Sequence, residues 1–251
     1  TGESPTHNTE EHISVIREVV RTVNGRIPVI AGTGANSTRE ALHLTEMAGE
    51  AGADAFLQVA PYYNKPSQEG IFQHLKKIAD STDKPIMLYS IPGRCGVDIG
   101  VETVTRLSSA CQNIAAIKEA GGDEERVKEH RRASPSVTVL SGDDGLIVPF
   151  TKVGAKGVVS VAANLCPEVI KSIMTACLDE KWAEAEQLVS EWHTLLTELV
   201  FLDGNPVTIK EVMYQAGRIP SPRVRLPLVR SSEEIQGQVR ELLGTLNLPV
   251  I

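Results

Sequence analysis

Apolar and polar positions along the chain form two kinds of segment. Short, nearly continuous apolar runs rich in β-branched residues are followed by longer stretches in which apolar residues recur every three or four positions. The first kind predicts strands buried on both faces of a sheet, and the second predicts amphipathic helices that cover the sheet. The expected strands occupy residues 27–32, 55–61, 85–92, 114–120, 137–142 and 157–163.

Helical patterns lie between these runs, and hydroxyl residues mark where two of them begin. Ser37 or Thr38 can cap one helix, and Ser67 can cap the next. The repeated order of strand and helix predicts βα units and a parallel sheet. The remaining helical patterns of this region cover residues 101–109, 123–133 and 144–153, and a helix from Thr9 precedes the first strand.

Six βα units fit either an open doubly wound sheet or part of an eight-stranded barrel. A dinucleotide-binding sheet would carry G-x-G-x-x-G after its first strand, but "AGTGANST" continues with Asn36 and Ser37. We therefore predict an α/β fold, a TIM (β/α)8 barrel that is N-terminally truncated, with two strands upstream of Thr1. From about Pro167 the pattern becomes entirely helical. The predicted domains are the barrel, residues 1–181, and a C-terminal helical region, residues 182–251.

Composition narrows the classes of partner. The 251 residues are 41% hydrophobic, enough for one large core, and carry a net charge of −7, which disfavours nucleic acid and anionic membranes. The four cysteines form no C-x-x-C pair, so neither a disulfide framework nor a Cys/His metal site is expected. No apolar run approaches the roughly 20 residues that cross a bilayer. We expect a cytoplasmic protein that acts on small molecules.

The stretch "NIAAIKEAGG" places Lys118 near the end of a buried strand. In a barrel the chemistry lies at the carboxyl ends of the strands. Lys118 could pack its stem on the barrel and reach Glu119 or solvent. It could also be a desolvated amine that attacks a carbonyl, as Schiff-base lysines do. Tyr89 would then relay protons rather than fill the core, and Arg94 could clamp a carboxylate rather than lie in solvent.

Several segments, taken in order, resemble the dihydrodipicolinate synthase family of pyruvate-dependent aldolases. They are "TGESPT", "IAGTGANST", "APYYNKPSQEG", "LYSIPGRCG", "IKEA", "LSGDD" and "GVVSVAAN", with "NPVTIK" further on. The resemblance implies a lyase of lysine and diaminopimelate biosynthesis that condenses pyruvate with L-aspartate 4-semialdehyde. It implies no metal or organic cofactor, because pyruvate forms its Schiff base with the protein.

The resemblance also assigns roles to individual residues. Lys118 would form the Schiff base, Tyr89 would relay protons, and Tyr63 would be lent to a neighbouring subunit of a homodimer or homotetramer. The substrate-binding residues would be Thr1, Gly2, Arg94, Gly142 and Val159. Lysine, as an inhibitor, would bind Ser4, Pro5, Thr9, His12, Gly34, Asn36, Glu40 and Tyr62. Because Thr9 stands where some members have histidine, sensitivity to lysine stays open.

The chain begins at the second threonine of the family's G-T-T-G-E motif and lacks the strand, helix and strand before it. We therefore expect a fragment of a longer enzyme. Two alternatives remain at this point. One is a sister pyruvate lyase, such as an N-acetylneuraminate lyase or a sugar-acid aldolase, which Arg94 disfavours. The other is a truncated paralogue that binds pyruvate or lysine without catalysis.

Overall fold

The computed structural model describes residues 2–246 and 248. The chain forms two compact units. The sheet unit contains Asn8–Gly142 and Val153–Lys156, and the helical unit contains Thr1–His7, Asp143–Lys152 and Gly157–Ile251. The domain division predicted at residues 181 and 182 stays a prediction. Within the described part of the chain, every helix is too short or too polar to span a membrane.

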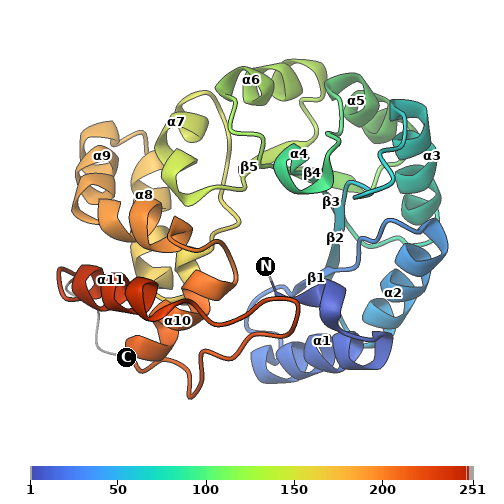
Figure 1. The fold of residues 1–251 in the computed structure, drawn as a ribbon. Helices are drawn as coiled ribbons and strands as arrows, with labels where there is room; N and C mark the ends of the chain where they lie inside the picture. The colour runs from blue at the N-terminus through green and yellow to red at the C-terminus, as the bar shows by residue number, and fades with distance from the viewer. Residues whose placement is uncertain (1, 247, 249–251) are drawn as a thin grey trace. The chain divides into compact units, whose positions relative to one another are not determined.

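A parallel sheet organises the sheet unit (Figure 1). Its strands pair with their neighbours in chain order, β1-β2-β3-β4-β5. Five of the six strands expected from the sequence are therefore present, each shortened at one or both ends. They are β1 (Ile30–Gly32), β2 (Ala55–Val59), β3 (Ile86–Ser90), β4 (Ile114–Glu119) and β5 (Thr138–Ser141).

Amphipathic helices cover one face of this sheet, each packed against the next (Figure 1). Their starts follow the predicted capping chemistry: Ser37 accepts the Glu40 N–H and Ser67 accepts the Gly70 N–H. Asn8 and Glu11 add a complete capping box at the first helix. The helices are α1 (Thr9–Val23), α2 (Thr38–Glu50), α3 (Gln68–Ala79), α5 (Val101–Ala110) and α6 (Glu124–Ala133), with the single turn α4 (Pro92–Cys95) after β3.

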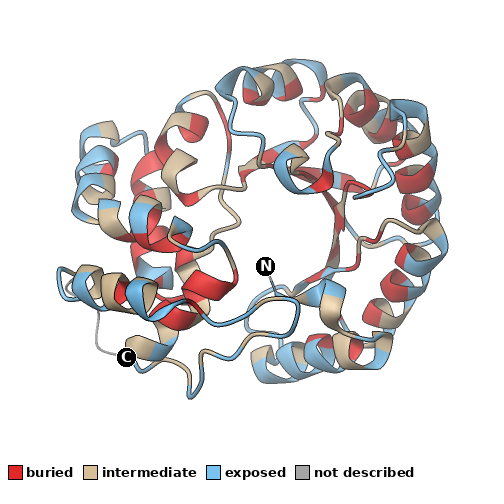
Figure 2. Ribbon diagram, viewed as in Figure 1, coloured by how far each residue is buried: buried red, intermediate tan, exposed pale blue. Residues whose placement is uncertain are grey.

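Burial differs along the sheet (Figure 2). Every residue of β3 is buried except the half-buried Tyr89, as a strand covered on both faces requires. In β1 and β2 burial alternates instead. Ala31 and Phe56 are buried in a cluster with residues of α1 and α2, whereas Ile30 is 47% exposed. The expectation of strands buried on both faces is thus met in β3 but not in β1 and β2.

The pairing of β3 with β4 contains an irregularity. Ile86 is paired with Ile114, but Met87 is paired with Ala116, so Ala115 is an extra residue in β4. Ala115 is exposed although its neighbours Ile114 and Ala116 are buried. Beyond this bulge the register is regular, with Tyr89 beside Lys118 and Ser90 beside Glu119.

The sixth expected strand, residues 157–163, was wrong. Only Val158 forms an isolated bridge there, and residues Ala162–Asn164 form the short helix η3. A strand requires consecutive ladder bonds. The buried carboxylate of Asp144 instead accepts the N–H groups of Val161 and Ala162 at 2.9 and 3.0 Å, and this side-chain competition turns the backbone out of the extended form.

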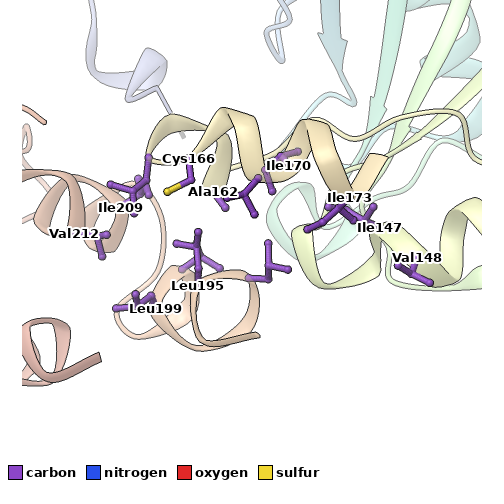
Figure 3. Close-up of a cluster of buried hydrophobic side chains, with 14 of the residues drawn as sticks. Ile147, Val148, Ala162, Cys166, Ile170, Ile173, Leu195, Leu199, Ile209 and Val212 are labelled. Carbon is purple, nitrogen blue, oxygen red and sulfur yellow. The ribbon is translucent and has the colours of Figure 1, made fainter. Parts of the chain in front are cut away.

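The helical unit has its own apolar core (Figure 3). Ile147, Ile173 and Leu195 are among its fully buried members, and the cluster joins helices that are distant in the sequence. Removing such side chains costs about 2–5 kcal/mol each. The elements are η1 (Ser4–Thr6), η2 (Asp144–Leu146), α7 (Ile147–Lys152), η3, α8 (Pro167–Leu178), α9 (Trp182–Glu191), the π-helical η4 (Thr194–Glu198), η5 (Leu199–Phe201), α10 (Val207–Gln215) and α11 (Glu233–Leu243).

Candidate active site

Lys118 and Tyr89 lie side by side at the carboxyl ends of two paired strands. They occupy the same register position of β4 and β3, so their side chains project from the same face of the sheet. The Lys118 Nζ lies 4.1 Å from the centroid of the Tyr89 ring, within the range of a cation–π contact. The structure thus brings together the two residues that the sequence proposed for the central chemistry.

Gly142 makes room for the Lys118 side chain. A Cβ atom at position 142 would lie 2.6 Å from the Cβ of Ala120 and 3.0 Å from the Cε of Lys118. The Gly142 N–H also donates to the carbonyl of Glu119 at 2.8 Å, which holds the end of β5 against the end of β4. Any side chain here would displace Lys118, so Gly142 belongs to the site through its lack of one.

Arg94 lies on α4, the single turn that follows β3. The sequence placed it in a Pro-Gly-Arg turn, and the structure shows that turn closed by the Gly96 N–H bonded to the Pro92 carbonyl. Arg94 is exposed. Its charge acts on Tyr89: burial raises the pKa of the Tyr89 hydroxyl, and Arg94 opposes that rise. Tyr89 therefore keeps its proton at neutral pH and can donate it.

Ser90 is a residue of this region that the sequence analysis did not single out. It is fully buried, its carbonyl accepts the Ala120 N–H at 2.9 Å, and its hydroxyl accepts the Ile99 N–H at 3.2 Å. It therefore ties the segment after α4 to the strand that carries Tyr89. The one available signal was a hydroxyl residue inside the apolar run "IMLYS".

Tyr63, the third predicted catalytic residue, is an exposed residue. It is 88% exposed and has a φ angle of +73°, a left-handed conformation that is strained for a residue with a side chain. Its N–H donates to the carbonyl of Cys95 at 3.4 Å, which fixes the strained turn beside α4. The Tyr63 ring is thus a large aromatic group on the surface, carried by a strained backbone position.

Part of the predicted lysine site also comes together within the sheet unit. The Asn36 side chain donates to the Tyr62 carbonyl at 3.2 Å, and Glu40 raises the pKa of the Tyr62 hydroxyl further than burial alone does. The loop between β1 and α2 contains Gly34 and passes close to β2: a Cβ at Gly34 would lie 2.4 Å from the Val59 nitrogen. His12 Nε2 forms a hydrogen bond with the Gly32 carbonyl at 2.8 Å.

Thr9, the first residue of α1, also lies in the sheet unit, whereas Ser4 and Pro5, in η1, belong to the helical unit. The structure therefore gathers Asn36, Glu40 and Tyr62 and leaves the predicted lysine set distributed over both units.

The remaining predicted substrate-binding residues of the helical unit, Gly2 and Val159, lie close in sequence to residues that take part in hydrogen bonds to carboxylates. Glu3, next to Gly2, accepts the Lys210 ammonium at 2.8 Å and the Arg225 N–H at 2.6 Å. Burial would raise the pKa of Glu3, but these two donors outweigh it and the pKa is lowered. Val159 precedes the backbone that Asp144 holds. Thr1 lies outside the described residues.

The cysteine thiols are not activated as nucleophiles. Cys95, Cys111, Cys166 and Cys177 are buried, free thiols, and burial raises the pKa of each. Among residues 2–246 and 248, no group of three or more His, Cys, Asp or Glu side chains is placed to hold a metal ion.

Comparison with known proteins finds many sequences and structures that are similar to this chain. A profile of the dihydrodipicolinate synthetase family matches residues 1–246. The 4-hydroxy-tetrahydrodipicolinate synthase of Sulfurihydrogenibium sp. is 47% identical over 244 residues, which cover 97% of this chain and 83% of that protein.

Two solved structures extend the comparison. The chloride-inhibited dihydrodipicolinate synthase of Acinetobacter baumannii, complexed with pyruvate, is 41% identical with a TM-score of 0.93, and the match covers 97% of this chain and 83% of that one. The synthase of Cyanidioschyzon merolae with lysine bound is 38% identical with a TM-score of 0.92, over the same shares of each chain. These similarities confirm the predicted fold class, a TIM-barrel fold with a C-terminal helical part.

Proposed function

Because the chain belongs to the dihydrodipicolinate synthetase family, we propose that it is a lyase that condenses pyruvate with L-aspartate 4-semialdehyde to 4-hydroxy-tetrahydrodipicolinate. The observation that carries the proposal is the pairing of Lys118 with Tyr89, 4.1 Å from the ammonium nitrogen to the ring centroid, at the carboxyl ends of two parallel strands. At this distance the amine can attack the carbonyl carbon of a substrate while the phenol exchanges protons with the same substrate.

The reaction follows from these groups. The Lys118 amine attacks C2 of pyruvate, and the carbinolamine loses water to give an iminium ion. Loss of a proton from C3 gives an enamine, whose C3 forms a bond to the aldehyde carbon of aspartate semialdehyde. The amino group of that substrate then attacks C2, the ring closes, and Lys118 leaves as the free amine. Tyr89 carries the protons that the addition and dehydration steps exchange.

Arg94 and the loops supply orientation. The exposed guanidinium of Arg94 can hold the carboxylate of aspartate semialdehyde through two parallel hydrogen bonds. From the family resemblance, Thr1, Gly2 and Val159 contact pyruvate, and Gly142 shapes the pocket around Lys118. The Schiff base itself accepts the electrons of the breaking C–H bond, so the proposed chemistry uses no metal and no organic cofactor.

The partners and the setting are part of the proposal. The exposed, strained Tyr63 supports a homodimer or homotetramer in which this ring enters the neighbouring subunit's site. Sedimentation should give a mass of two or four chains, and Tyr63→Ala should shift it toward the monomer; a wild-type monomer would contradict the assembly.

The proposed location is the cytoplasm, because four free cysteines fit a reducing compartment, and fractionation of the source cells would test it.

Lysine is the proposed inhibitor. The gathering of Asn36, Glu40 and Tyr62 supports this, as does the lysine bound to the synthase of Cyanidioschyzon merolae. Glu40 can pair with the ligand's ammonium group. Inhibition by millimolar lysine should be lost in Glu40→Gln with turnover unchanged, and an insensitive wild type would refute the proposal.

The proposed function is tested by trapping. Pyruvate followed by borohydride should add a reduced pyruvyl group to Lys118, located by intact mass and peptide mapping. Lys118→Ala should form no adduct, whereas the surface variant Lys128→Ala should form as much as the wild type. Turnover is then measured with aspartate semialdehyde and with the aldehyde of an amino sugar. Faster turnover of the amino-sugar aldehyde would identify a sister lyase, and an adduct without any turnover would identify a binding paralogue.

A further inference from the structure

A buried carboxylate lies directly behind the reactive lysine. Glu119 follows Lys118 in β4, and its side chain is fully buried. One oxygen, Oε1, accepts the Gly121 N–H at 2.8 Å. The other, Oε2, lies 3.5 Å from Nε of Arg126 and 3.5 Å from Nε2 of the buried His130. A carboxylate taken out of water requires such partners, so Arg126 and the Gly121 amide stabilise the charge at the end of β4.

Arg126 joins this strand to the segment that carries Arg94. Its Nη1 donates to the Asp98 carboxylate at 2.7 Å and its Nη2 donates to the Ile99 carbonyl at 2.9 Å. The guanidinium, on α6, therefore contacts groups from two other segments, the end of β4 and the chain that leaves α4. The side chain is 22% exposed, so solvent competes little for these bonds.

The segment that contains Arg94 is consequently held at both ends. It leaves the sheet at Ser90, and it returns at Ile99, whose N–H donates to the Ser90 hydroxyl and whose carbonyl accepts from Arg126. Gln68 of α3 adds a bond to the Asp98 carbonyl at 3.0 Å. Arg126 adds a side-chain contact with the carboxylate of Glu119, the neighbour of Lys118.

We propose that Arg126 is a positioning residue that fixes Arg94 relative to Lys118. By contacting Glu119, Asp98 and Ile99 together, it sets where the carboxylate of the second substrate lies when its aldehyde carbon meets the enamine. The inference rests on the proposed function. Misplacement of a reacting group by about 1 Å can cost about a hundredfold in rate. The Schiff base with pyruvate does not involve Arg94 and depends less on Arg126.

Three variants test the proposal. Arg126→Met removes all the contacts, and Arg126→Lys restores the charge but replaces the planar, spread donors of the guanidinium by the three hydrogens of one ammonium nitrogen, which do not match the three acceptors. Asp98→Asn weakens only the bond between Arg126 and Asp98, which lies in the segment that carries Arg94. Because the Asp98 side chain is 38% exposed, this variant should fold and can replace Arg126→Met if that variant does not. The control is Arg106→Met, which removes an arginine that pairs with Glu69 at the same distance of 2.7 Å between α5 and α3.

The expected result is a split between the two substrates. Arg126→Met should raise KM for aspartate semialdehyde about tenfold or more while KM for pyruvate and the yield of borohydride adduct stay within about twofold; Arg126→Lys should recover part of the loss, and Asp98→Asn should act in the same direction. Equal changes for both substrates, or constants equal to those of Arg106→Met, would overturn the proposal.

Hydrogen exchange separates this inference from the proposed function. In Arg126→Met, the peptides over residues 91–100 and 119–123 should exchange faster than in Arg106→Met, because the Ile99 carbonyl loses its bond from Arg126 and the Glu119 carboxylate, which holds the Gly121 N–H, loses its guanidinium partner. Unchanged exchange would overturn the positioning role whether or not the wild type turns over aspartate semialdehyde. A wild type without turnover would instead contradict the proposed function.

Discussion

At the scale of single residues, the space around Lys118, the proposed Schiff-base lysine, is as important as its chemistry. Gly142 is needed because a Cβ there would meet Ala120 and Lys118 at 2.6 and 3.0 Å. The sequence could group Lys118, Tyr89 and Arg94 as one candidate site because Lys118 and Tyr89 lie toward the carboxyl ends of predicted strands and Arg94 follows one. It could not show that Arg126 belongs beside them, since Arg126 lies on a helix and reaches Asp98 and Ile99, 28 and 27 positions earlier.

The first prediction concerns Gly142→Ala. The added methyl group should push the Lys118 side chain from its place, slow adduct formation at least about tenfold, and lower the free energy of unfolding by about 1–3 kcal/mol. The rate of adduct formation is measured by adding borohydride to samples taken at timed intervals after pyruvate. The control is Gly237→Ala, where a Cβ would meet nothing within 4 Å. Equal rates in the two variants would contradict the steric role of Gly142.

The second prediction concerns the Tyr89 hydroxyl. Tyr89→Phe should lower kcat by about 10²- to 10⁴-fold, because proton transfer loses its carrier. Burial raises the pKa of Tyr89 above its ordinary value of 10.0. The folded state therefore favours the neutral phenol, and that contribution to stability is lost only as pH rises above about 10. Chemical denaturation at increasing pH should show that Tyr89→Phe loses less free energy of unfolding in alkali than the wild type does. Identical pH profiles of the two proteins would contradict the raised pKa of Tyr89.

At the scale of elements, helix starts were the most predictable part of the fold. Capping is local, so Ser37 and Ser67 could be identified from neighbouring residues alone. Strands depend on partners that are distant in the sequence. The run at residues 157–163 has the apolar composition of a strand, yet Asp144 takes two of its N–H groups and a short helix results.

The third prediction follows from the capping box of α1. The Asn8 side chain accepts the Glu11 N–H at 2.8 Å, and the Glu11 carboxylate accepts the Asn8 N–H at 3.1 Å. Asn8→Ala should lower the free energy of unfolding by about 1 kcal/mol, and Asn8→Ser should restore most of the loss. Chemical denaturation measures both. Equal stability of Asn8→Ala and the wild type would show that the box contributes nothing.

At the scale of the whole molecule, the two units differ in what holds them. The sheet unit is held by its strand ladder, interrupted once at Ala115, and by its covering helices, which hydrophobic periodicity predicts well. The helical unit is held by its apolar core and also by charge contacts between distant residues, such as that of the Arg230 guanidinium, which donates to both oxygens of the buried Glu211 at 2.7 and 2.9 Å. Such pairs leave no periodic signature, so the sequence predicted the helices of this unit but not their connections.

The fourth prediction is acid sensitivity of the helical unit. Hydrogen bonding to Arg230 lowers the pKa of Glu211 from its ordinary value of 4.5. The pair therefore stabilises the fold above pH 4.5, and its contribution is lost as pH falls through the lowered pKa. Glu211→Gln should be less stable at neutral pH and lose less stability on acidification. Glu69→Gln, at an exposed pair, should change little. Parallel acid profiles for all three proteins would contradict this.

The extra residue at Ala115 has a consequence for anyone who moves this chemistry to another scaffold. Counted without interruption from the pair Ile86 and Ile114, the neighbour of Tyr89 would be Ile117 rather than Lys118. Successive side chains of a strand face opposite ways, so a graft that keeps Ala115 but pairs it in a regular ladder would turn the amine away from the phenol. Such a graft should form no borohydride adduct, and deleting Ala115 from it should return Lys118 to its place beside Tyr89 and restore the adduct.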